Sequence, residues 1–385
     1  MVTRKKGLRI LHCIPGLHGG GAERQLSYLC DALQAKGVDV HLAYHLQEPA
    51  LNGAAGSRVT IHKLPSYGNH DPRLLWELVK LIRRIKPDVV QTWLLQMDVL
   101  GGLAAVATRT PLLMTERSVA AAYAGLWKEG LRNWIGRRAA LVVANSRGGQ
   151  EYWASRKRSR PTEVVPNAVP VAKIQQESAA SLETYDATER TEILLFAGRY
   201  SAEKNLFKLL DALGIVLSKR PTASALLFGG GALKGELEAR VKIHRMEDRV
   251  KILDYTDHLW SWMSRASVLV SVSLFEGSPN VVVEAAAAGC PLVLSDIEQH
   301  RELFGDTAAR FVGFEEPTEI ARGILDVLRN PEEANARAQA AYQIVSDFTV
   351  DSLADSYLSL YNRVAKRQLA SSGLAPIPIV TSRKT

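Results

Sequence analysis

Residues 267–296 read SVLVSVSLFEGSPNVVVEAAAAGCPLVLSD, and this stretch decides how the fold is interpreted. The apolar run at 267–275 is typical of a buried strand, and a second apolar run at 291–296 is its counterpart. Between them, residues 280–289 have the pattern of a helix that ends at a glycine. Strand, helix and strand in this order predict a βαβ unit, whose two strands lie parallel in one sheet.

The same alternation extends over most of the chain. Amphipathic segments separate the apolar runs, for example at 22–37, 72–87, 205–221 and 234–246. We therefore expect an α/β protein with two open, parallel sheets, each covered by helices, and ligands at the carboxyl ends of the strands. The further strands are expected at 8–15, 39–45, 88–93, 111–116, 140–146 and 162–169, then at 192–199, 223–231, 249–255 and 309–314.

A polar segment without a clear period separates the two halves. It predicts a linker at 171–190 between a first domain, 1–170, and a second domain, 191–348. A last amphipathic helix at 349–370 is expected to pack back on the first domain. The tail at 371–385, rich in Pro, Ser and basic residues, is expected to be disordered.

Composition limits the class of protein. The chain has 385 residues but only three cysteines, which argues against a disulfide scaffold or a zinc site and for a reducing, cytoplasmic setting. No stretch approaches the roughly 18–20 uninterrupted apolar residues of a membrane-spanning helix. A formal net charge of +8 does not by itself predict nucleic-acid binding.

Two basic runs have two possible interpretations. RNWIGRRAA, at 132–140, and SRKRSRP, at 155–161, are either solvated surface or a face that touches an anionic membrane. The first half is also rich in tryptophan, which suits a lipid interface as well as a core. A peripheral contact with the inner face of a membrane is therefore a hypothesis.

Several loops carry residues suited to an anionic ligand. Gly19–Gly21 stand between the first strand and the first helix, where backbone amides and a helix N-terminus favour a phosphate, although a tight turn is the alternative. Arg199 and Lys204 follow the strand at 192–199 and suit a diphosphate, although they could be solvated. Gly229–Gly231 are explained by a turn that needs positive φ.

Two glutamates bracket the loop of the opening stretch. Ser278 is the expected N-cap and Pro279 the first-turn residue, so Glu276 precedes the helix and Glu284 lies within it. A separation of about 12 Å along a helix exceeds the ~5–9.5 Å between paired carboxylates of glycosidases. Two separate contacts on one long ligand fit better, with the helix N-terminus facing a phosphate between them.

The segment FEGSPNVVVEAAAAGCPLVLSD resembles the E-x7-E region of retaining, glycogen-synthase-like glycosyltransferases of the GT-B fold. Other stretches match that family in the same order, and the resemblance covers roughly residues 8–345. These stretches are GGGAERQLSYLCDALQAKGVDVHL, ANS with VVPNAV, and FAGRYSAEKN. The resemblance implies two facing Rossmann-like domains with a cleft between them.

The resemblance also implies roles for single residues. Glu276 would bind hydroxyls of the transferred sugar and Glu284 the ribose, while Arg199 and Lys204 would neutralise the diphosphate leaving group. No D-x-D motif occurs, so neither a metal nor another cofactor is expected besides the nucleotide-sugar co-substrate. The expected donor-binding residues are Gly20, Gly21, Arg199, Lys204, Gly277, Asn280, Val281 and Glu284.

One position departs from the family pattern. Where many relatives have a histidine near the reacting sugar, this chain reads LLMTERSVA, with Glu116 and Arg117. Glu116 is our candidate for a further catalytic residue, and the alternative is a solvent-exposed ion pair with Arg117.

The expected activity is transfer of a sugar from a nucleotide-diphosphate donor, with UDP as the expected nucleotide, to a glycan or a lipid-linked saccharide. Such a reaction belongs to polysaccharide or surface-glycan biosynthesis. An epimerase acting on nucleotide sugars and a non-catalytic binding protein of the same fold are the alternatives.

Overall fold

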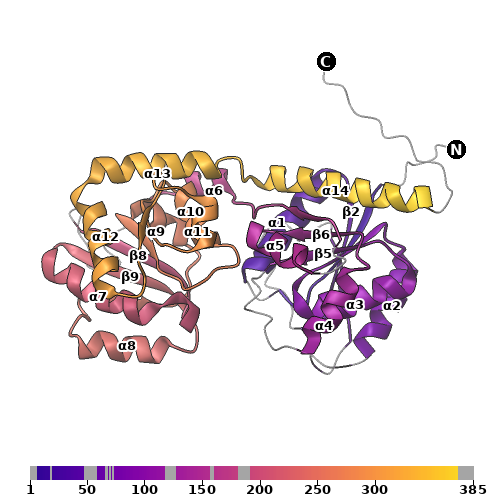
Figure 1. Cartoon of the computed structure of the whole chain (residues 1–385), viewed down its shortest axis with the longest axis horizontal. Coiled ribbons are helices and arrows are strands. Elements are labelled where there is room, and N and C mark those ends of the chain that lie inside the picture. Colours follow the sequence, from indigo (N-terminus) through magenta and orange to yellow (C-terminus); the bar gives the residue numbers. More distant parts are fainter. Residues whose placement is uncertain are drawn as a thin grey trace, which may run out of the picture. The chain divides into compact units, whose positions relative to one another are not determined.

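The structure is a computed structural model that describes residues 7–17, 20–46, 59–65, 68, 71, 73–117, 127–156, 160–180 and 191–371. The chain divides into two compact units. The first unit contains residues 1–168 and 350–385, and the second contains residues 169–349. Figure 1 shows the elements of each unit, coloured along the sequence.

The first unit is built on a seven-stranded sheet with the order β3-β2-β1-β4-β5-β6-β7. All its strand pairs are parallel. The strands are β1 (Arg9–Cys13), β2 (Asp39–Tyr44), β3 (Thr60–Lys63), β4 (Val89–Thr92), β5 (Leu112–Glu116), β6 (Leu141–Ala144) and β7 (Thr162–Val164). The edge strand β3 was not predicted, because its four residues, TIHK, lack the apolar run of the other strands.

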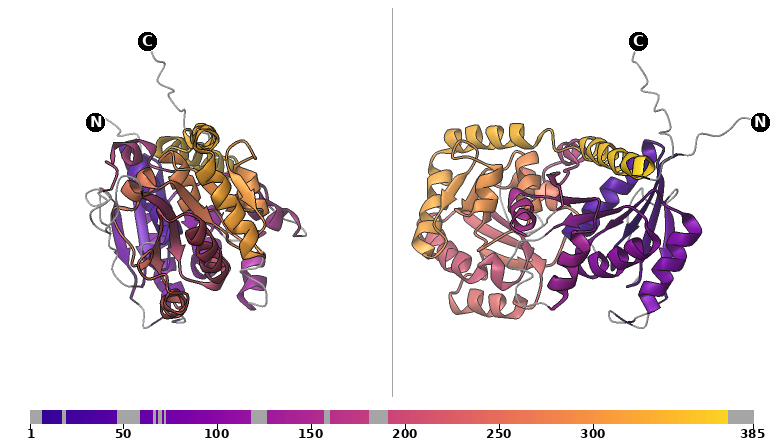
Figure 2. Two further views of the ribbon diagram at one scale, coloured as in Figure 1. Left: turned by 90° about the vertical axis from the view of Figure 1, so that its left-hand side faces the viewer. Right: turned by 45° about the vertical axis from the view of Figure 1, so that its right-hand side comes forward.

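Helices cover both faces of this sheet. One core cluster lies under α1 and α14, and another lies under α2, α3, α4 and α5. The right-hand view in Figure 2 shows α14, in yellow, along the outside of the first unit. The helices are α1 (Gly21–Ala35), α2 (Arg73–Ile85), α3 (Leu94–Thr108), α4 (Trp127–Gly136), α5 (Arg147–Ala154) and α14 (Val350–Ser371).

The second unit is built on a six-stranded sheet with the order β10-β9-β8-β11-β12-β13. Its strand pairs are also parallel. The strands are β8 (Glu192–Arg199), β9 (Ala223–Gly230), β10 (Val250–Leu253), β11 (Val268–Ser271), β12 (Leu292–Ser295) and β13 (Arg310–Val312).

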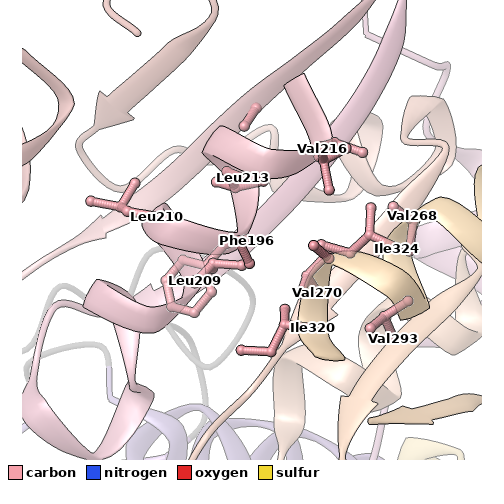
Figure 3. Packing of buried hydrophobic residues seen from close by; sticks show 14 of the residues in the cluster. Phe196, Leu209, Leu210, Leu213, Val216, Val268, Val270, Val293, Ile320 and Ile324 are labelled. Carbon is pink, nitrogen blue, oxygen red and sulfur yellow. The ribbon is translucent and has the colours of Figure 1, made fainter. Parts of the chain in front are cut away.

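The helices of the second unit also lie on two faces. α7, α8 and α12 share one core cluster, in which Leu209, Leu213 and Ile324 lie close to Phe196 and Val270 of the sheet (Figure 3). The other cluster gathers α6, α9, α10 and α13. The helices are α6 (Val171–Gln176), α7 (Leu206–Lys219), α8 (Lys234–Ile243), α9 (Leu259–Arg265), α10 (Asn280–Ala287), α11 (Glu298–Leu303), α12 (Pro317–Arg329) and α13 (Pro331–Val345).

The predicted linker at 171–190 needs a correction. Its first residues form α6, which belongs to the second unit, because Val171 and Ile174 are buried in that unit's core. Residues 181–190 and the predicted tail beyond Ser371 lie outside the described residues. α14 packs against α1 in the core of the first unit, where Tyr357 and Tyr361 are fully buried.

Candidate functional site

The second sheet has a topological switch point between β8 and β11. From β8 the chain continues to β9 and β10 on one side, and from β11 it continues to β12 and β13 on the other. In open parallel sheets, ligands bind outside the carboxyl ends of the strands at such a point. Arg199 is the last residue of β8, and the loop with Glu276 follows β11. The topology thus brings two predicted site segments to one sheet edge.

Lys204 and Glu276 meet at this edge. Lys204 ends the short 3₁₀ helix η3 (Ala202–Lys204), and its Nζ lies 2.6 Å from Oε1 of Glu276. The hydroxyl of Ser273 donates to the same oxygen at 2.7 Å. The two loops are also joined through their backbones, since Leu274 N donates to Glu203 O at 2.8 Å. The carboxylate is therefore held in a fixed orientation by a cation and a hydroxyl.

The exposure of these groups suits a ligand-binding edge. Glu276 is buried, with 9% of its surface exposed, whereas the Lys204 side chain is 20% exposed. Arg199, at the end of β8, is exposed. A largely buried carboxylate can accept hydrogen bonds from the hydroxyl groups of a ligand. Two cations nearer the solvent can bind an anionic group of the same ligand.

Glycines allow the strand ends of β8 and β9 to come close together. A Cβ atom on Gly229 would lie 1.9 Å from the carbonyl oxygen of Gly198, so no side chain fits there. Gly231 has φ +151°, the positive value that the sequence predicted for this glycine run.

The N-cap of helix α10 lies one residue later than predicted. This N-cap is Pro279 rather than Ser278, and no side chain caps the helix. Pro279 lacks an amide hydrogen but its carbonyl accepts from Val282 and Val283 N, so it closes the first turn. Asn280 and Val281 are the first helical residues, as their predicted role near a phosphate requires.

Glu284 lies inside α10 and is buried, with 4% of its surface exposed. The indole Nε1 of Trp260, in α9, donates to its Oε2 at 3.0 Å. Sequence reasoning missed Trp260 because it lies 24 residues before Glu284, on another helix. The indole fixes one oxygen of the second predicted ligand contact.

In the first unit, the glycine loop leads into a helix N-terminus as predicted. Gly20 is the N-cap of α1 and Gly21 its first residue, and no side chain caps the helix. A Cβ on Gly20 would lie 2.4 Å from Oε2 of Glu23, so a side chain there would displace that glutamate. Gly19 lies outside the described residues.

Glu116 lies in an environment different from the one the sequence predicted. Its side chain is fully buried, and its Oε2 accepts from Arg132 Nη1 at 2.8 Å and from Trp153 Nε1 at 2.9 Å. Arg132 also pairs with Asp98 at 2.8 Å, and both side chains are fully buried. The hypothesis of a ligand-contacting Glu116 is corrected here, because its carboxylate has no accessible surface. The alternative of an exposed pair with Arg117 is wrong.

Arg117 has partners of its own. Its guanidinium binds Asn167 and the hydroxyl of Tyr357, and it lies 4.4 Å from the centre of a Trp93 ring. The sequence could not show this arrangement, since the partners come from the N-cap of α3, the segment after β7, and α14.

Two findings concern metals and membranes. In the described part of the chain, no group of three or more His, Cys, Asp or Glu residues is placed to hold a metal ion. None of the described helices is long and apolar enough to cross a membrane.

Comparison with known proteins identifies the class of protein that this fold represents. The protein of Anabaena called Alr3699/HepE, solved in complex with UDP and glucose, superposes with a TM-score of 0.78 at 19% identity, over 92% of this chain and 100% of that one. A glycosyltransferase from Rickettsia africae superposes with a TM-score of 0.80 at 16% identity, over 94% of this chain and 99% of that one. The fold is that of the GT-B glycosyltransferases.

Family models place the chain within this class. The model of Glycosyl transferases group 1 matches residues 180–344, and the model of Glycosyltransferase Family 4 matches residues 19–173. Both models describe glycosyltransferases, one for each half of the chain, so the chain is a glycosyltransferase, and the epimerase and non-catalytic alternatives are not supported.

One curated relative covers most of the chain. It is the N-acetylgalactosamine-N,N'-diacetylbacillosaminyl-diphospho-undecaprenol 4-alpha-N-acetylgalactosaminyltransferase of Campylobacter jejuni, which is 25% identical over 76% of this chain and 82% of its own length.

Proposed function

We propose that this glycosyltransferase moves a sugar, with retention of configuration, from a UDP-linked donor to a glycan or a lipid-linked saccharide. The observation that carries this proposal is the Lys204–Glu276 pair at the switch point of the second sheet. A carboxylate that binds sugar hydroxyls and a cation that binds phosphate are needed side by side for such a donor.

In this proposal, residues of the second unit bind different parts of the donor. Glu276 accepts hydrogen bonds from hydroxyl groups of the transferred sugar, and Lys204 and Arg199 bind the diphosphate. Lys204 has three N–H donors, so it can keep its bond to Glu276 while it binds a phosphate oxygen. The amides around Gly277, Asn280 and Val281 also face the phosphates, and Glu284 accepts from the ribose.

In the proposed reaction, an acceptor hydroxyl attacks the anomeric carbon from the face of the leaving group. The bond between that carbon and the phosphate oxygen breaks as the new glycosidic bond forms. The hydroxyl proton passes to the departing diphosphate oxygen, whose charge Arg199 and Lys204 stabilise. Gly20 and Gly21 would add backbone amides to the diphosphate. No metal is required in this scheme.

What similar proteins bind or act on supports the choice of donor and acceptor. The structurally similar Anabaena protein was solved with UDP and glucose, and the Campylobacter relative acts on a diphospho-undecaprenol saccharide. A role in polysaccharide or surface-glycan biosynthesis is proposed on this basis.

A donor panel tests the proposal. Thermal unfolding is recorded with UDP, GDP and ADP sugars, and the best stabiliser is then incubated with lipid-linked and free saccharides. We expect stabilisation by one UDP-sugar and a product with retained anomeric configuration by NMR. Equal melting temperatures across the panel, or an inverted product, would contradict the donor assignment or the retaining mechanism.

A basic surface with an exposed tryptophan supports a membrane-bound acceptor. Arg160, near the end of the second basic run, contacts the first run, because its Nε donates to the carbonyl of Arg137 at 2.8 Å. Within the first run, Arg138 stacks on the ring of Trp134 at 3.6 Å, and Trp134 is 39% exposed. An interfacial aromatic ring among arginines is complementary to an anionic lipid surface. We propose that this surface contacts such a membrane.

Vesicle co-sedimentation tests the membrane contact. The wild type should sediment with vesicles that contain phosphatidylglycerol more than with pure phosphatidylcholine. The combined change Trp134→Ala, Arg137→Ala and Arg138→Ala should abolish the difference. A control with Lys242→Ala and Arg245→Ala, exposed residues of the other unit, should leave it unchanged. Equal binding by the triple variant and the wild type would contradict this proposal alone.

A further inference from the structure

A buried histidine is linked through two serines to Glu276, the carboxylate proposed to bind the sugar. His300, in α11, is fully buried. Its Nδ1 lies 3.0 Å from the carbonyl oxygen of Ser295 and 3.2 Å from the hydroxyl of the same residue. A carbonyl oxygen only accepts, so Nδ1 must carry the hydrogen. The contact therefore fixes the tautomer of this imidazole.

The hydrogen bonds continue from Ser295 to Glu276. The hydroxyl of Ser295 donates to the carbonyl of Ser273 at 2.7 Å, and the hydroxyl of Ser273 donates to Oε1 of Glu276 at 2.7 Å. His300, Ser295 and Ser273 thus form one chain of contacts, from α11 across the ends of β12 and β11. We call these three residues the serine–histidine relay.

The relay ends on the same oxygen that Lys204 binds. Lys204 Nζ and Ser273 Oγ both contact Oε1 of Glu276. Two donors on one oxygen hold the plane of the carboxylate and direct Oε2 to other partners. Lys204 is partly exposed and free to follow a phosphate, whereas Ser273, Ser295 and His300 are fully or almost fully buried. Of the two contacts to Oε1 of Glu276, the one from the relay is therefore the more rigid.

The surroundings of His300 favour the uncharged form of its imidazole. Burial lowers its pKa, and the charge of Lys204 acts in the same direction, while the Ser295 contact and the Glu276 charge oppose it. Its Nε2 makes no hydrogen bond within the described part of the chain. The fold therefore uses only the Nδ1–H group of this ring.

We infer that His300 is a positioning residue for sugar transfer, which fixes the orientation of Glu276 through Ser295 and Ser273. This inference rests on the proposed role of Glu276 as the contact to the donor sugar. His300 touches neither the donor nor the reacting atoms.

Substitution of His300 by asparagine or glutamine distinguishes a hydrogen-bonding role of this residue from a role in packing alone. The amide nitrogen of asparagine occupies the position of Nδ1, so His300→Asn can keep the donor to Ser295. His300→Gln places its amide one bond further out, and His300→Leu has no donor. We expect kcat to fall about tenfold in the Gln and Leu variants, as for loss of one oriented hydrogen bond, and to recover to within about threefold in the Asn variant.

Transfer is measured with the UDP-sugar that stabilises the wild type most, and UDP binding is measured by calorimetry. UDP carries no sugar, so its Kd should be the same in all variants. Rescue by Asn with an unchanged UDP Kd supports the inference. Equal rates in all variants, or an Asn variant as slow as the Leu variant, would overturn it.

A spectroscopic test does not depend on activity. The ¹⁵N shifts of labelled histidine, with the His300 signals assigned by their loss in His300→Asn, report which ring nitrogen is protonated. The relay requires hydrogen on Nδ1, and hydrogen on Nε2 would refute it. A wild type that binds no nucleotide sugar but shows the Nδ1–H tautomer would instead contradict the proposed function and leave the relay geometry intact.

Discussion

Each unit of the molecule holds a glutamate against a cation, and the two pairs differ in what surrounds them. Glu276 and Lys204 are 2.6 Å apart at the carboxyl edge of the second sheet, where the lysine is partly exposed. Glu116 and Arg132 are 2.8 Å apart in the first unit, where neither side chain has any exposed surface. One pair can meet a ligand, and the other cannot.

The comparison shows that a carboxylate–cation pair is not by itself a sign of function. The pair of the first unit is surrounded by Asp98, which also binds Arg132, and by Trp153, whose indole donates to Glu116. Such a group joins α3, α4 and α5 to the end of β5. The pair of the second unit keeps an open side at the position where parallel sheets bind ligands.

Removal of the buried cation should have the largest effect. Arg132→Met leaves Glu116 and Asp98 buried without their shared cation, and we expect a loss of about 3–5 kcal/mol in the free energy of unfolding. Chemical denaturation measures it, with Arg138→Met, on the surface, as the control. A stable variant that had lost transfer activity would show that the buried group takes part in the reaction.

Removal of the open cation should affect activity instead. Lys204→Met should lower kcat by roughly 10²–10³-fold, because the leaving diphosphate loses a preorganised charge. Lys219→Met, an exposed residue at the end of α7, is the matched control. Both variants are compared by transfer assays and thermal unfolding. Equal kcat values for the two would show that Lys204 does not take part in the mechanism.

A smaller effect is expected at the second glutamate of the site. Trp260→Phe keeps an aromatic ring but removes the donor to Glu284. Loss of one hydrogen bond to a charged group should raise the donor KM about tenfold, with little change in kcat. A change in kcat alone would place Glu284 in the chemical step rather than in donor binding.

A last effect concerns pH and the buried core of the first unit. Burial lowers the pKa of His12 from 6.5 to about 3. Below pH 6.5 the unfolded chain binds a proton that the folded chain does not, so the stabilisation is present above that pH and is lost as the pH falls towards 3. Denaturation between pH 7 and pH 4 should show a shallower decline for His12→Gln. Parallel curves would contradict this contribution.

Much of the fold was predictable because buried parallel strands are short apolar runs. The stretch at 267–296 gave a strand, a helix and a strand, as observed in β11, α10 and β12. Strand β3 was missed because an exposed edge strand needs no apolar run. Residues 171–176 were assigned to a linker, because a six-residue helix such as α6 is too short to show a period.

The candidate site was predictable only in part. Glu276 and Lys204 could be predicted as site residues because each follows a predicted strand, and the carboxyl ends of parallel strands lie at one edge of the sheet. Ser273, Ser295 and Trp260 were not found, because a serine or tryptophan carries no signal of its partner. Glu116 was misjudged, since nothing local shows that Arg132 reaches it from α4.

One paired measurement tests the central claim most directly. Glu276→Gln and Glu116→Gln are the same isosteric change in the two pairs, and each variant is assayed for sugar transfer per folded molecule and for thermal stability. The account predicts that Glu276→Gln loses transfer by about 10²-fold at an almost unchanged melting temperature, whereas Glu116→Gln melts earlier and keeps its kcat. The reverse result would contradict it, because the donor site would then lie at the buried pair.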